Sequence, residues 1–155
     1  MKGNKKIIER LNKLLSEELS AVNQYVIQSE MCSNWGYNKL AKKLKEHSVE
    51  EMGHAEKIIE RIVFLEGIPL IQSSNKISIG KDVAEQLIQD SLSENTAIKM
   101  YNGSIKLATE YEDEGTSELL RSILVDEEKH LDWLDSQYDL IGQIGIQNYL
   151  TEQIE

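Results

Sequence analysis

Two short motifs in this sequence pair a glutamate with a histidine three positions later: Glu51 with His54, and Glu127 with His130. On an α-helix, side chains three positions apart project from the same face. Each motif would therefore direct one carboxylate and one imidazole at the same point. Carboxylate oxygens and imidazole nitrogens are common metal ligands, so metal binding is the chemistry that these motifs indicate.

A lone glutamate precedes each motif at the same interval. Glu18 precedes Glu51 by as many positions as Glu94 precedes Glu127. The whole pattern thus occurs twice at one constant sequence offset, which we name the hairpin repeat. We interpret this repeat as two copies of a helical hairpin related by a pseudo-two-fold axis, with all four glutamates and both histidines converging at mid-height.

Charge balance favours two cations rather than one. The glutamates fall on core-facing positions of the helical pattern, and no Lys or Arg shares those positions. An isolated buried carboxylate is costly unless it is protonated or paired with a counter-charge, and two divalent cations would neutralise four carboxylates. The lack of thiolate ligands argues against a closed structural zinc site and favours iron or manganese. The predicted ligands are Glu18, Glu51, His54, Glu94, Glu127 and His130.

The composition predicts an all-α fold that can position these groups. The 155 residues include one Pro and nine Gly, and residues with high helix propensity are abundant. Apolar residues recur at spacings of three and four, which is typical of helices packed in a bundle. We expect a single domain over residues 1–155, with helices at about 4–34, 37–65, 83–112 and 116–141 and a short fifth helix at 146–154.

The segment between the second and third helices is long for a compact domain. Residues 67–82 form this connection, whereas antiparallel neighbours need only short links. We therefore expect it to cross the length of an antiparallel four-helix bundle and to join the two hairpins. Its turn-forming residues are Gly67, Pro69, Ser73, Ser74, Asn75 and Gly80. The other breaks are expected near Gly36, at residues 112–115 and at Gly142 and Gly145.

Charge and cysteine content limit the classes of function. The formal net charge is −10, and no run of Lys and Arg is long enough for a nucleic-acid groove, so we expect no nucleic-acid partner. No apolar stretch approaches the length that a membrane span needs. The single Cys32 excludes an intramolecular disulfide, and the opening MKGNKKIIERLNKLL lacks the apolar core of a signal peptide. We expect a cytoplasmic protein.

Over essentially its whole length the chain resembles bacterioferritin, the haem-containing branch of the ferritin family. The resemblance lies in the opening MKGNKKIIERLNKLLSEELSAVNQY, the segment IIERIVFLEGIP, the run VDEEKHLDWL and the ending LIGQIGIQNYL. It implies a ferritin-like fold and a shell of twenty-four subunits, built from two-fold dimers, that oxidises Fe²⁺ with oxygen or peroxide and stores the mineral. The six predicted ligands match the ferroxidase ligands of that family, with two irons per subunit. The resemblance is also compatible with a ferredoxin-like partner that reduces the stored iron for release.

A second apolar stripe marks the helix expected at residues 37–65. It consists of Val49, Met52, Ile59 and Val63, and an exposed stripe of this kind is expected to be covered by another chain. From the residues alone, Met52 could simply fill an interface. The resemblance implies instead that Met52 is an axial haem ligand, so that one haem b is shared between two subunits; axial Met is a known haem ligand.

Other polar and aromatic residues lie near the predicted ligands in the helical pattern. Tyr25 is expected to be a buried tyrosine hydrogen-bonded beside the site, and the resemblance implies that it donates electrons. His47 is expected to hydrogen-bond near the ligands rather than to bind metal. At Glu46 and Glu50 the chain departs from relatives that carry a His and an Asp, which leaves electron delivery from the inner surface open. Trp133 is adjacent to the second motif and could be packing alone.

Two other functions remain open at this point. One is a di-iron or di-manganese oxidase or peroxidase of the ferritin-like superfamily that builds no storage shell, and particle size distinguishes it. The other is a structural bundle whose acidic core binds zinc without turnover. The addition of Fe²⁺ in air distinguishes that case, because a structural bundle would consume no oxygen.

Overall fold

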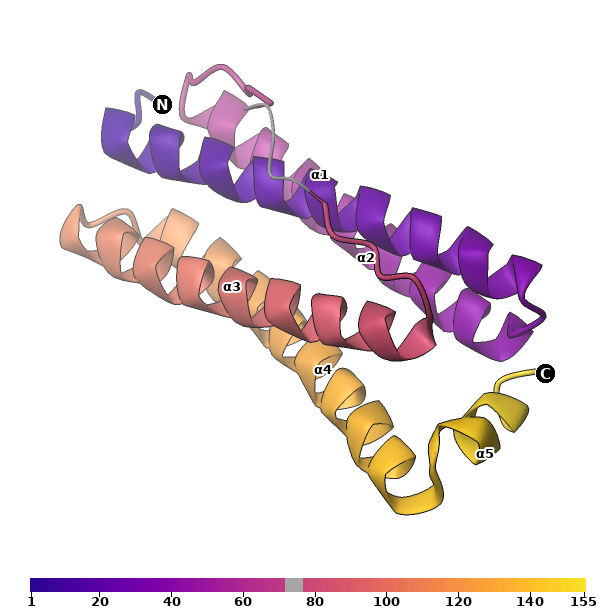
Figure 1. Ribbon diagram of the computed structural model, residues 1–155. Helices are drawn as coiled ribbons and strands as arrows, with labels where there is room; N and C mark the ends of the chain where they lie inside the picture. Colours follow the sequence, from indigo (N-terminus) through magenta and orange to yellow (C-terminus); the bar gives the residue numbers. More distant parts are fainter. Residues whose placement is uncertain (72–76) are drawn as a thin grey trace.

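The computed structural model describes residues 1–71 and 77–155, and the regular elements in these ranges are helices. They are α1 (Lys5–Asn34), α2 (Asn38–Phe64), α3 (Val83–Glu110), α4 (Glu114–Ile144) and α5 (Ile146–Thr151). α1 and α2 form one antiparallel hairpin, α3 and α4 form a second, and the two hairpins lie side by side (Figure 1). The predicted fold, a four-helix bundle followed by a short fifth helix, is confirmed.

The first hairpin turns where the backbone requires a left-handed conformation. α1 ends as the N–H of Trp35 donates to the carbonyl of Met31 and the N–H of Tyr37 donates to that of Cys32. Gly36 lies between them with φ of +87°, a conformation in which glycine meets no Cβ penalty. This turn folds α2 back along α1, so that Glu18 and Glu51 reach the same height.

α4 is longer at both ends than the sequence predicted. It begins at Glu114 because the Asp113 carboxylate accepts a hydrogen bond from the Thr116 N–H and caps the helix. At the other end, α4 stops at the second of the two glycines predicted to end it, not at the first. A glycine inside a helix costs only about 1 kcal/mol, and α4 passes through Gly142 and ends at Gly145, where φ is +80°.

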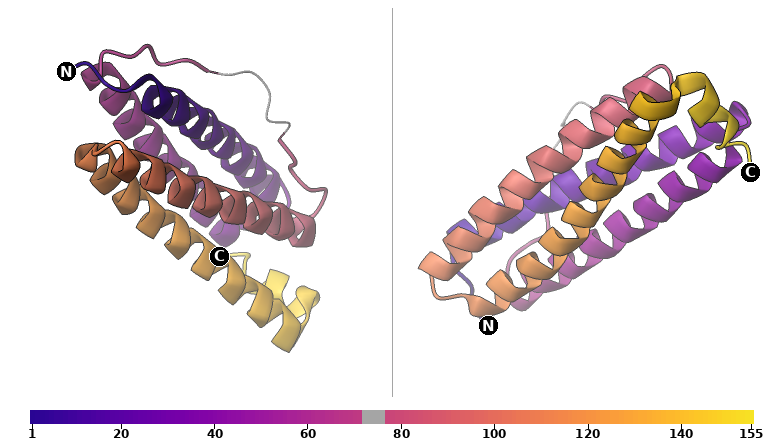
Figure 2. Two further views of the ribbon diagram at one scale, coloured as in Figure 1. Left: turned by 90° about the vertical axis from the view of Figure 1, so that its left-hand side faces the viewer. Right: turned by 90° about the horizontal axis from the view of Figure 1, so that it is seen from below.

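The described parts of the connection between the hairpins contact α1 at opposite ends of the bundle (Figure 2). Near its start, the buried Asn12 side chain donates to the carbonyl of Ile68 and accepts from the N–H of Leu70. Near its end, Gln28 donates to the carbonyl of Ile79. These contacts confirm the predicted long crossover. Its central residues 72–76, which include Ser73, Ser74 and Asn75, lie outside the described part of the chain.

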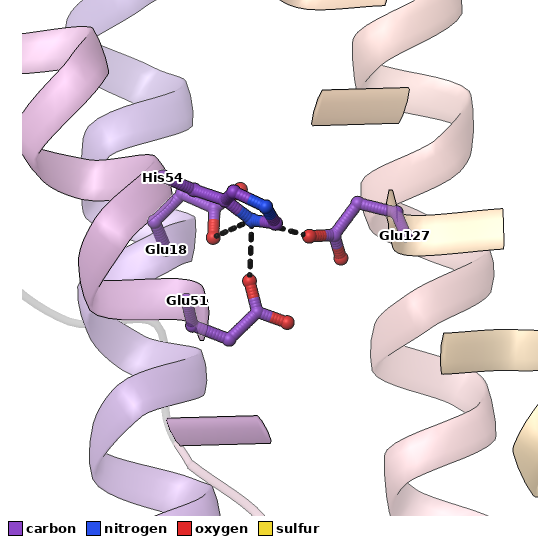
Figure 3. Close-up of side chains that lie close together, drawn as sticks. All are labelled: Glu18, Glu51, His54 and Glu127. Atoms are coloured by element: carbon purple, nitrogen blue, oxygen red, sulfur yellow. Dashed lines mark hydrogen bonds and ion pairs between the residues drawn. The ribbon is translucent and has the colours of Figure 1, made fainter. Parts of the chain in front are cut away.

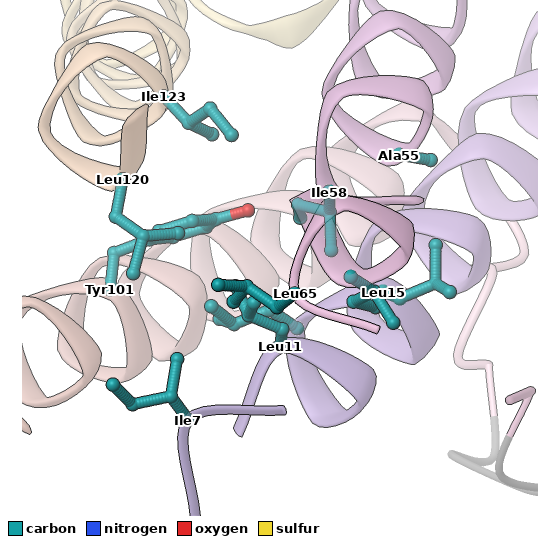
Figure 4. Packing of buried hydrophobic residues seen from close by; sticks show 11 residues of the cluster. Ile7, Leu11, Leu15, Ala55, Ile58, Leu65, Tyr101, Leu120 and Ile123 are labelled. Carbon is teal, nitrogen blue, oxygen red and sulfur yellow. The ribbon is translucent and has the colours of Figure 1, made fainter. Parts of the chain in front are cut away.

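The apolar core is divided into two clusters. The first cluster fills the end of the bundle near the N-terminus (Figure 4) and consists of Ile7, Leu11, Leu14, Leu15, Ala55, Ile58, Ile62, Leu65, Tyr101, Leu120 and Ile123. The second cluster fills the opposite end and consists of Tyr25, Cys32, Leu40, Ala41, Leu44, Val83, Leu87, Leu134 and Tyr149. The predicted ligands lie in the polar layer between these clusters, so apolar packing on both sides shields them from solvent.

α5 closes the second end of the bundle. Tyr149 is fully buried, and its hydroxyl donates to Gln137 Oε1 at 2.9 Å. The carbonyl of Gln153 accepts from the N–H of Lys39 and joins the C-terminal segment to α2. Within residues 1–71 and 77–155, no helix combines the length and apolar character needed to cross a bilayer.

A buried acid lies in the seam between α1 and α3, one helical turn from Glu94. Asp90 is 0% exposed, Oδ1 accepts from Gln24 Nε2 at 2.7 Å, and Oδ2 has no hydrogen-bond partner among the described residues. Burial raises the pKa of Asp90 to about 7, although hydrogen bonds from Gln24 and Gln28 oppose the increase. The native protein therefore favours the neutral acid at this position.

We expect Asp90→Asn to remove a pH dependence of stability. In the unfolded chain this carboxyl ionises near its model value of 3.8, but in the fold it ionises near 7. Its contribution is therefore full below pH 4 and is lost as pH rises to 7, by on the order of 4 kcal/mol per subunit. Unfolding curves between pH 4 and pH 8 should show that the free energy of unfolding of the variant increases relative to that of wild type as pH rises.

Asp135→Asn is the matched control because Asp135 is exposed on α4. This control should follow the wild-type curve at every pH. If Asp90→Asn also remained parallel to wild type, the raised pKa of Asp90 would be wrong.

Candidate metal centre

The six predicted ligands meet in the interior, and all four long helices contribute. α1 supplies Glu18, α3 supplies Glu94, and α2 and α4 each supply a glutamate–histidine pair. Each of the six is at most 3% exposed. The structure therefore brings together every residue that the two motifs and their upstream glutamates indicated.

The ligand atoms form two overlapping groups. Glu18, Glu51, His54 and Glu127 offer ligand atoms that all lie within 4.8 Å of one another; we name this group the first metal position. Glu51, Glu94, Glu127 and His130 form the second metal position by the same criterion. Glu51 and Glu127 belong to both groups. They can bridge two cations, while a glutamate and a histidine remain as terminal ligands of each.

At the first metal position three carboxylates surround the His54 ring (Figure 3). His54 Nδ1 lies 2.9 Å from Glu127 Oε1, 3.1 Å from Glu51 Oε2 and 3.6 Å from Glu18 Oε2. These carboxylates come from α1, α2 and α4, so three helices converge on one ring nitrogen. His54 Nδ1 is therefore the atom of this imidazole that faces the carboxylates and is placed to bind a cation.

The second metal position has the same arrangement. His130 Nδ1 lies 3.0 Å from Glu51 Oε1 and 3.4 Å from Glu94 Oε1. The two oxygens of Glu51 thus face different histidines, as expected for a carboxylate that bridges two cations. The pseudo-two-fold repeat inferred from the sequence is present in the geometry.

The carboxylate oxygens also fit cations. Glu18 Oε2 and Glu94 Oε2 are buried and have no hydrogen-bond partner among the described residues. The ion pairs formed by the four glutamates in residues 1–71 and 77–155 involve histidine, not Lys or Arg. Because buried unpaired carboxylates are costly, this oxygen-rich cluster requires protons or cations.

The shifted pKa values favour protons on Glu51 and Glu127 when cations are not bound, whereas burial of Glu94 is outweighed by hydrogen bonds that lower its pKa. Burial raises the pKa of Glu127 to about 12, and burial together with the charge of Glu18 raises that of Glu51. Burial alone would lower the pKa of His130, but its hydrogen bond with Glu94 raises it to about 9. Cations binding here must displace these protons.

Four residues around the ligands make hydrogen bonds to them. Tyr25 donates to Glu94 Oε1 at 2.6 Å, as expected for a buried tyrosine beside the site, and Tyr101 donates to Glu18 Oε1. Asp126 Oδ2 lies 3.2 Å from His54 Nε2, and Glu50 Oε2 lies 2.6 Å from His130 Nε2. Neither Tyr101 nor Asp126 was predicted from the sequence to contact the ligands. The hairpin repeat would have found both, from Tyr25 and from Glu50.

His47 contacts the site differently from the prediction. Its ring stacks on that of His130 with a centroid distance of 4.4 Å and meets Tyr25 and Trp133 edge-on at 5.2 and 5.0 Å. Burial and the neighbouring His130 lower the pKa of His47 to about 3, and its Nδ1 has no hydrogen-bond partner among the described residues. His47 is a neutral packing ring. Glu46 is exposed and pairs with Lys43 at 3.9 Å.

Met52 lies outside this centre, on the surface of α2. It is 39% exposed, and the neighbouring Val49 and Val63 are 64% and 57% exposed. Ile59, the remaining member of the stripe, packs against the first core cluster. The thioether and the exposed valines thus form an apolar strip that is not covered within the subunit.

A cavity of about 330 Å³ between α1 and α3 reaches the metal positions from the side. It is lined by Glu18, Glu94 and Glu127 at its inner end and by polar residues such as Glu17 and Gln24. Small ions can therefore approach the ligands without separating the helices.

The chain is similar to known proteins over nearly its whole length. A family model described as the ferritin-like domain matches residues 8–144. A bacterioferritin of Brucella melitensis is 44% identical over 149 residues, covering 96% of this chain and 92% of that protein. A bacterioferritin of Rhodobacter capsulatus is 41% identical with the same coverage, and one of Mycobacterium tuberculosis is 36% identical over 98% of this chain and 96% of that protein.

We expect cation binding to release protons and to tighten as pH rises. Titration with Zn²⁺ should release roughly two to four protons per subunit, with affinity rising about tenfold per pH unit for each displaced proton. The increase should become less steep near pH 9, where His130 loses its proton, and should continue above it because Glu127 retains its proton to about pH 12. Calorimetry in two buffers with different ionisation heats gives the number of protons.

Glu127→Gln should lower that number by about one, because a carboxyl that retains its proton to about pH 12 is removed. Glu128→Gln changes an exposed neighbour on the same helix and should leave the number unchanged. Binding without proton release would contradict the protonated cluster described above.

Proposed function

The chain belongs to the bacterioferritins, iron-storage proteins built on the ferritin-like domain, and we propose that it is a ferroxidase whose substrate is Fe²⁺. The observation that carries the proposal is the pair of four-ligand groups that share Glu51 and Glu127. Four carboxylates balance the charge of two divalent ions. Two Fe²⁺ ions together supply the two electrons that reduce one peroxide to water or one dioxygen to peroxide.

The residues of the site have separate tasks in this reaction. Glu51 and Glu127 hold the two substrate ions close together, and Glu18 and Glu94 each complete one position. The two histidines bind through Nδ1, which faces the carboxylates in both groups. Carboxylate ligands accept the higher charge of Fe³⁺ as readily as that of Fe²⁺, because hard oxygen donors bind both ions. The two groups support a stoichiometry of two irons per subunit.

The cavity between α1 and α3 is the proposed route of Fe²⁺ to the site. Its lining runs from Glu17 and Gln24 to Glu94 and Glu127, so oxygen ligands accompany a cation along the path. A protein with a net charge of −10 attracts cations to its surface. Tyr25, hydrogen-bonded to Glu94 at 2.6 Å, is the proposed electron donor for oxidants that need more than two electrons.

Storage requires an assembly beyond the single subunit. We propose a shell of twenty-four copies built from two-fold dimers that encloses the ferric mineral, in the cytoplasm, with a ferredoxin-like protein as reductant for iron release. The exposed apolar side chains of Val49, Met52 and Val63 on one helix support the dimer, because exposed apolar side chains favour burial against a second copy.

We further propose that one haem b is held at that two-fold interface. Met52 is 39% exposed and shares its helix surface with exposed valines, so Met52 from each of two subunits would hold the haem. Haem bound in this way would provide a one-electron redox group near the metal positions.

Oxygen consumption on addition of Fe²⁺ tests the ferroxidase. We expect wild type to oxidise Fe²⁺ much faster than buffer alone, and Glu51→Gln to lower the initial rate at least about tenfold, because both positions lose a charged ligand. Glu128→Gln on the exposed face of α4 should retain the wild-type rate. Oxidation at the wild-type rate by Glu51→Gln would contradict the site. Size-exclusion chromatography of the same sample separates a storage shell from a small oxidase.

Met52→Ala tests the haem site. We expect the variant to assemble normally but to bind less than about a tenth of the haem of wild type, because it lacks the thioether ligand. The visible spectrum of protein reconstituted with haem measures this loss. Val49→Ala, which changes the same exposed strip without removing a ligand, should keep its haem. A normal haem spectrum in Met52→Ala would exclude this residue as the ligand.

A further inference from the structure

Each histidine ligand has an outer carboxylate that comes from the other hairpin. His54 on α2 contacts Asp126 on α4 through Nε2 at 3.2 Å, and His130 on α4 contacts Glu50 on α2 through Nε2 at 2.6 Å. Glu50 and Asp126 are separated by the same sequence offset as His54 and His130. The two contacts are therefore equivalent under the hairpin repeat, and each one crosses between hairpins.

The terminal glutamates follow the same rule. Tyr101 on α3 donates to Glu18 on α1, and Tyr25 on α1 donates to Glu94 on α3. Tyr25 and Tyr101 are also related by the hairpin repeat. All four terminal ligands thus receive a hydrogen bond or close polar contact from the hairpin that does not carry them.

The surroundings of these four partners differ in a regular way. Tyr25 and Tyr101 are 2% and 1% exposed, and each belongs to a different apolar cluster. Their hydroxyls therefore have no solvent to replace the bond to a glutamate. The side chains of Glu50 and Asp126 are 50% and 37% exposed at the seam between α2 and α4. The terminal glutamates are therefore contacted by buried tyrosine hydroxyls, and the two histidines are contacted by partly exposed carboxylates between α2 and α4.

These contacts leave the correct atom of each ligand directed at the cations. A histidine that donates Nε2–H to a carboxylate carries its lone pair on Nδ1, which is the nitrogen that faces the bridging glutamates. Each tyrosine occupies Oε1 of its glutamate. The other oxygen, Oε2 of Glu18 or of Glu94, has no hydrogen-bond partner among the described residues and remains to bind a metal ion.

We propose that Tyr101, Asp126 and Glu50 are positioning residues, and that the terminal ligands of each metal position come from one hairpin and are held in geometry by the other. The first metal position depends on Tyr101 and Asp126, whereas the second depends on Glu50 together with Tyr25. This inference rests on the proposed function only in that both positions bind a cation. It adds that substitution of one outer residue weakens cation binding at one metal position and not at the other.

Co²⁺ binding resolved by position tests this directly. Crystals of the assembled protein are soaked at a series of Co²⁺ concentrations, and anomalous scattering at the cobalt edge gives the occupancy of each position. We expect Asp126→Ala to weaken binding at the first position by about 10- to 100-fold and to change the second less than about threefold. Glu50→Ala should give the reverse. Asp126→Asn keeps an acceptor for the Nε2–H of His54, so it should weaken Co²⁺ binding at the first position less than Asp126→Ala does.

Two matched variants control for charge and for helix surface. Glu128→Ala and Glu46→Ala remove exposed carboxylates from the same two helices, and both should retain wild-type occupancy at each position. Tyr101→Phe removes one buried hydroxyl and should affect the first position alone, so it provides an independent test if Asp126→Ala assembles poorly.

Equal losses at both positions, or no loss in Asp126→Ala, Glu50→Ala and Tyr101→Phe, would overturn the inference while leaving the metal centre intact. Wild-type protein that binds Co²⁺ at neither position would instead refute the proposed metal centre, and this inference with it. The Co²⁺ occupancies of the two positions therefore distinguish a failure of this inference from a failure of the proposed metal centre.

Discussion

Four carboxylates buried in the middle of an apolar bundle are the constraint on which the rest of this structure depends. Glu18, Glu51, Glu94 and Glu127 are each at most 3% exposed, and their ion pairs in the described residues involve histidine rather than Lys or Arg. Without cations the cluster retains protons, as the raised pKa values of Glu51 and Glu127 show. Folding thus creates an acidic site that is satisfied fully only when positive ions enter.

The hairpin repeat explains how so many ligands reach one point. A single hairpin could bring Glu18, Glu51 and His54 together, but it could not supply a second bridging carboxylate. The second hairpin provides Glu127, and the crossover, which contacts α1 at opposite ends of the bundle, places that hairpin at the same height. The same repeat supplies the outer contacts of the terminal ligands. Each outer polar residue therefore contacts a terminal ligand of the other hairpin rather than a ligand of its own hairpin.

The sequence predicted this site better than its surroundings because the ligands obey a strict helical spacing. Glu51 with His54, and the copy of this pair in the second hairpin, could be assigned from periodicity alone. Tyr101 and Asp126 obey the same repeat, but a tyrosine or an aspartate on a helix carries no ligand signal without its partner. His47 packs by its ring, which spacing cannot distinguish from a hydrogen bond. Gly142 and Gly145 differ only in backbone φ, which the sequence does not contain.

A crystal structure of protein loaded anaerobically with Fe²⁺ tests the central claim most directly. The account predicts two iron ions in each subunit, both bridged by Glu51 and Glu127, with Glu18 and His54 on one and Glu94 and His130 on the other. A single ion, or two ions on the outer surface with the six side chains unmoved, would contradict it.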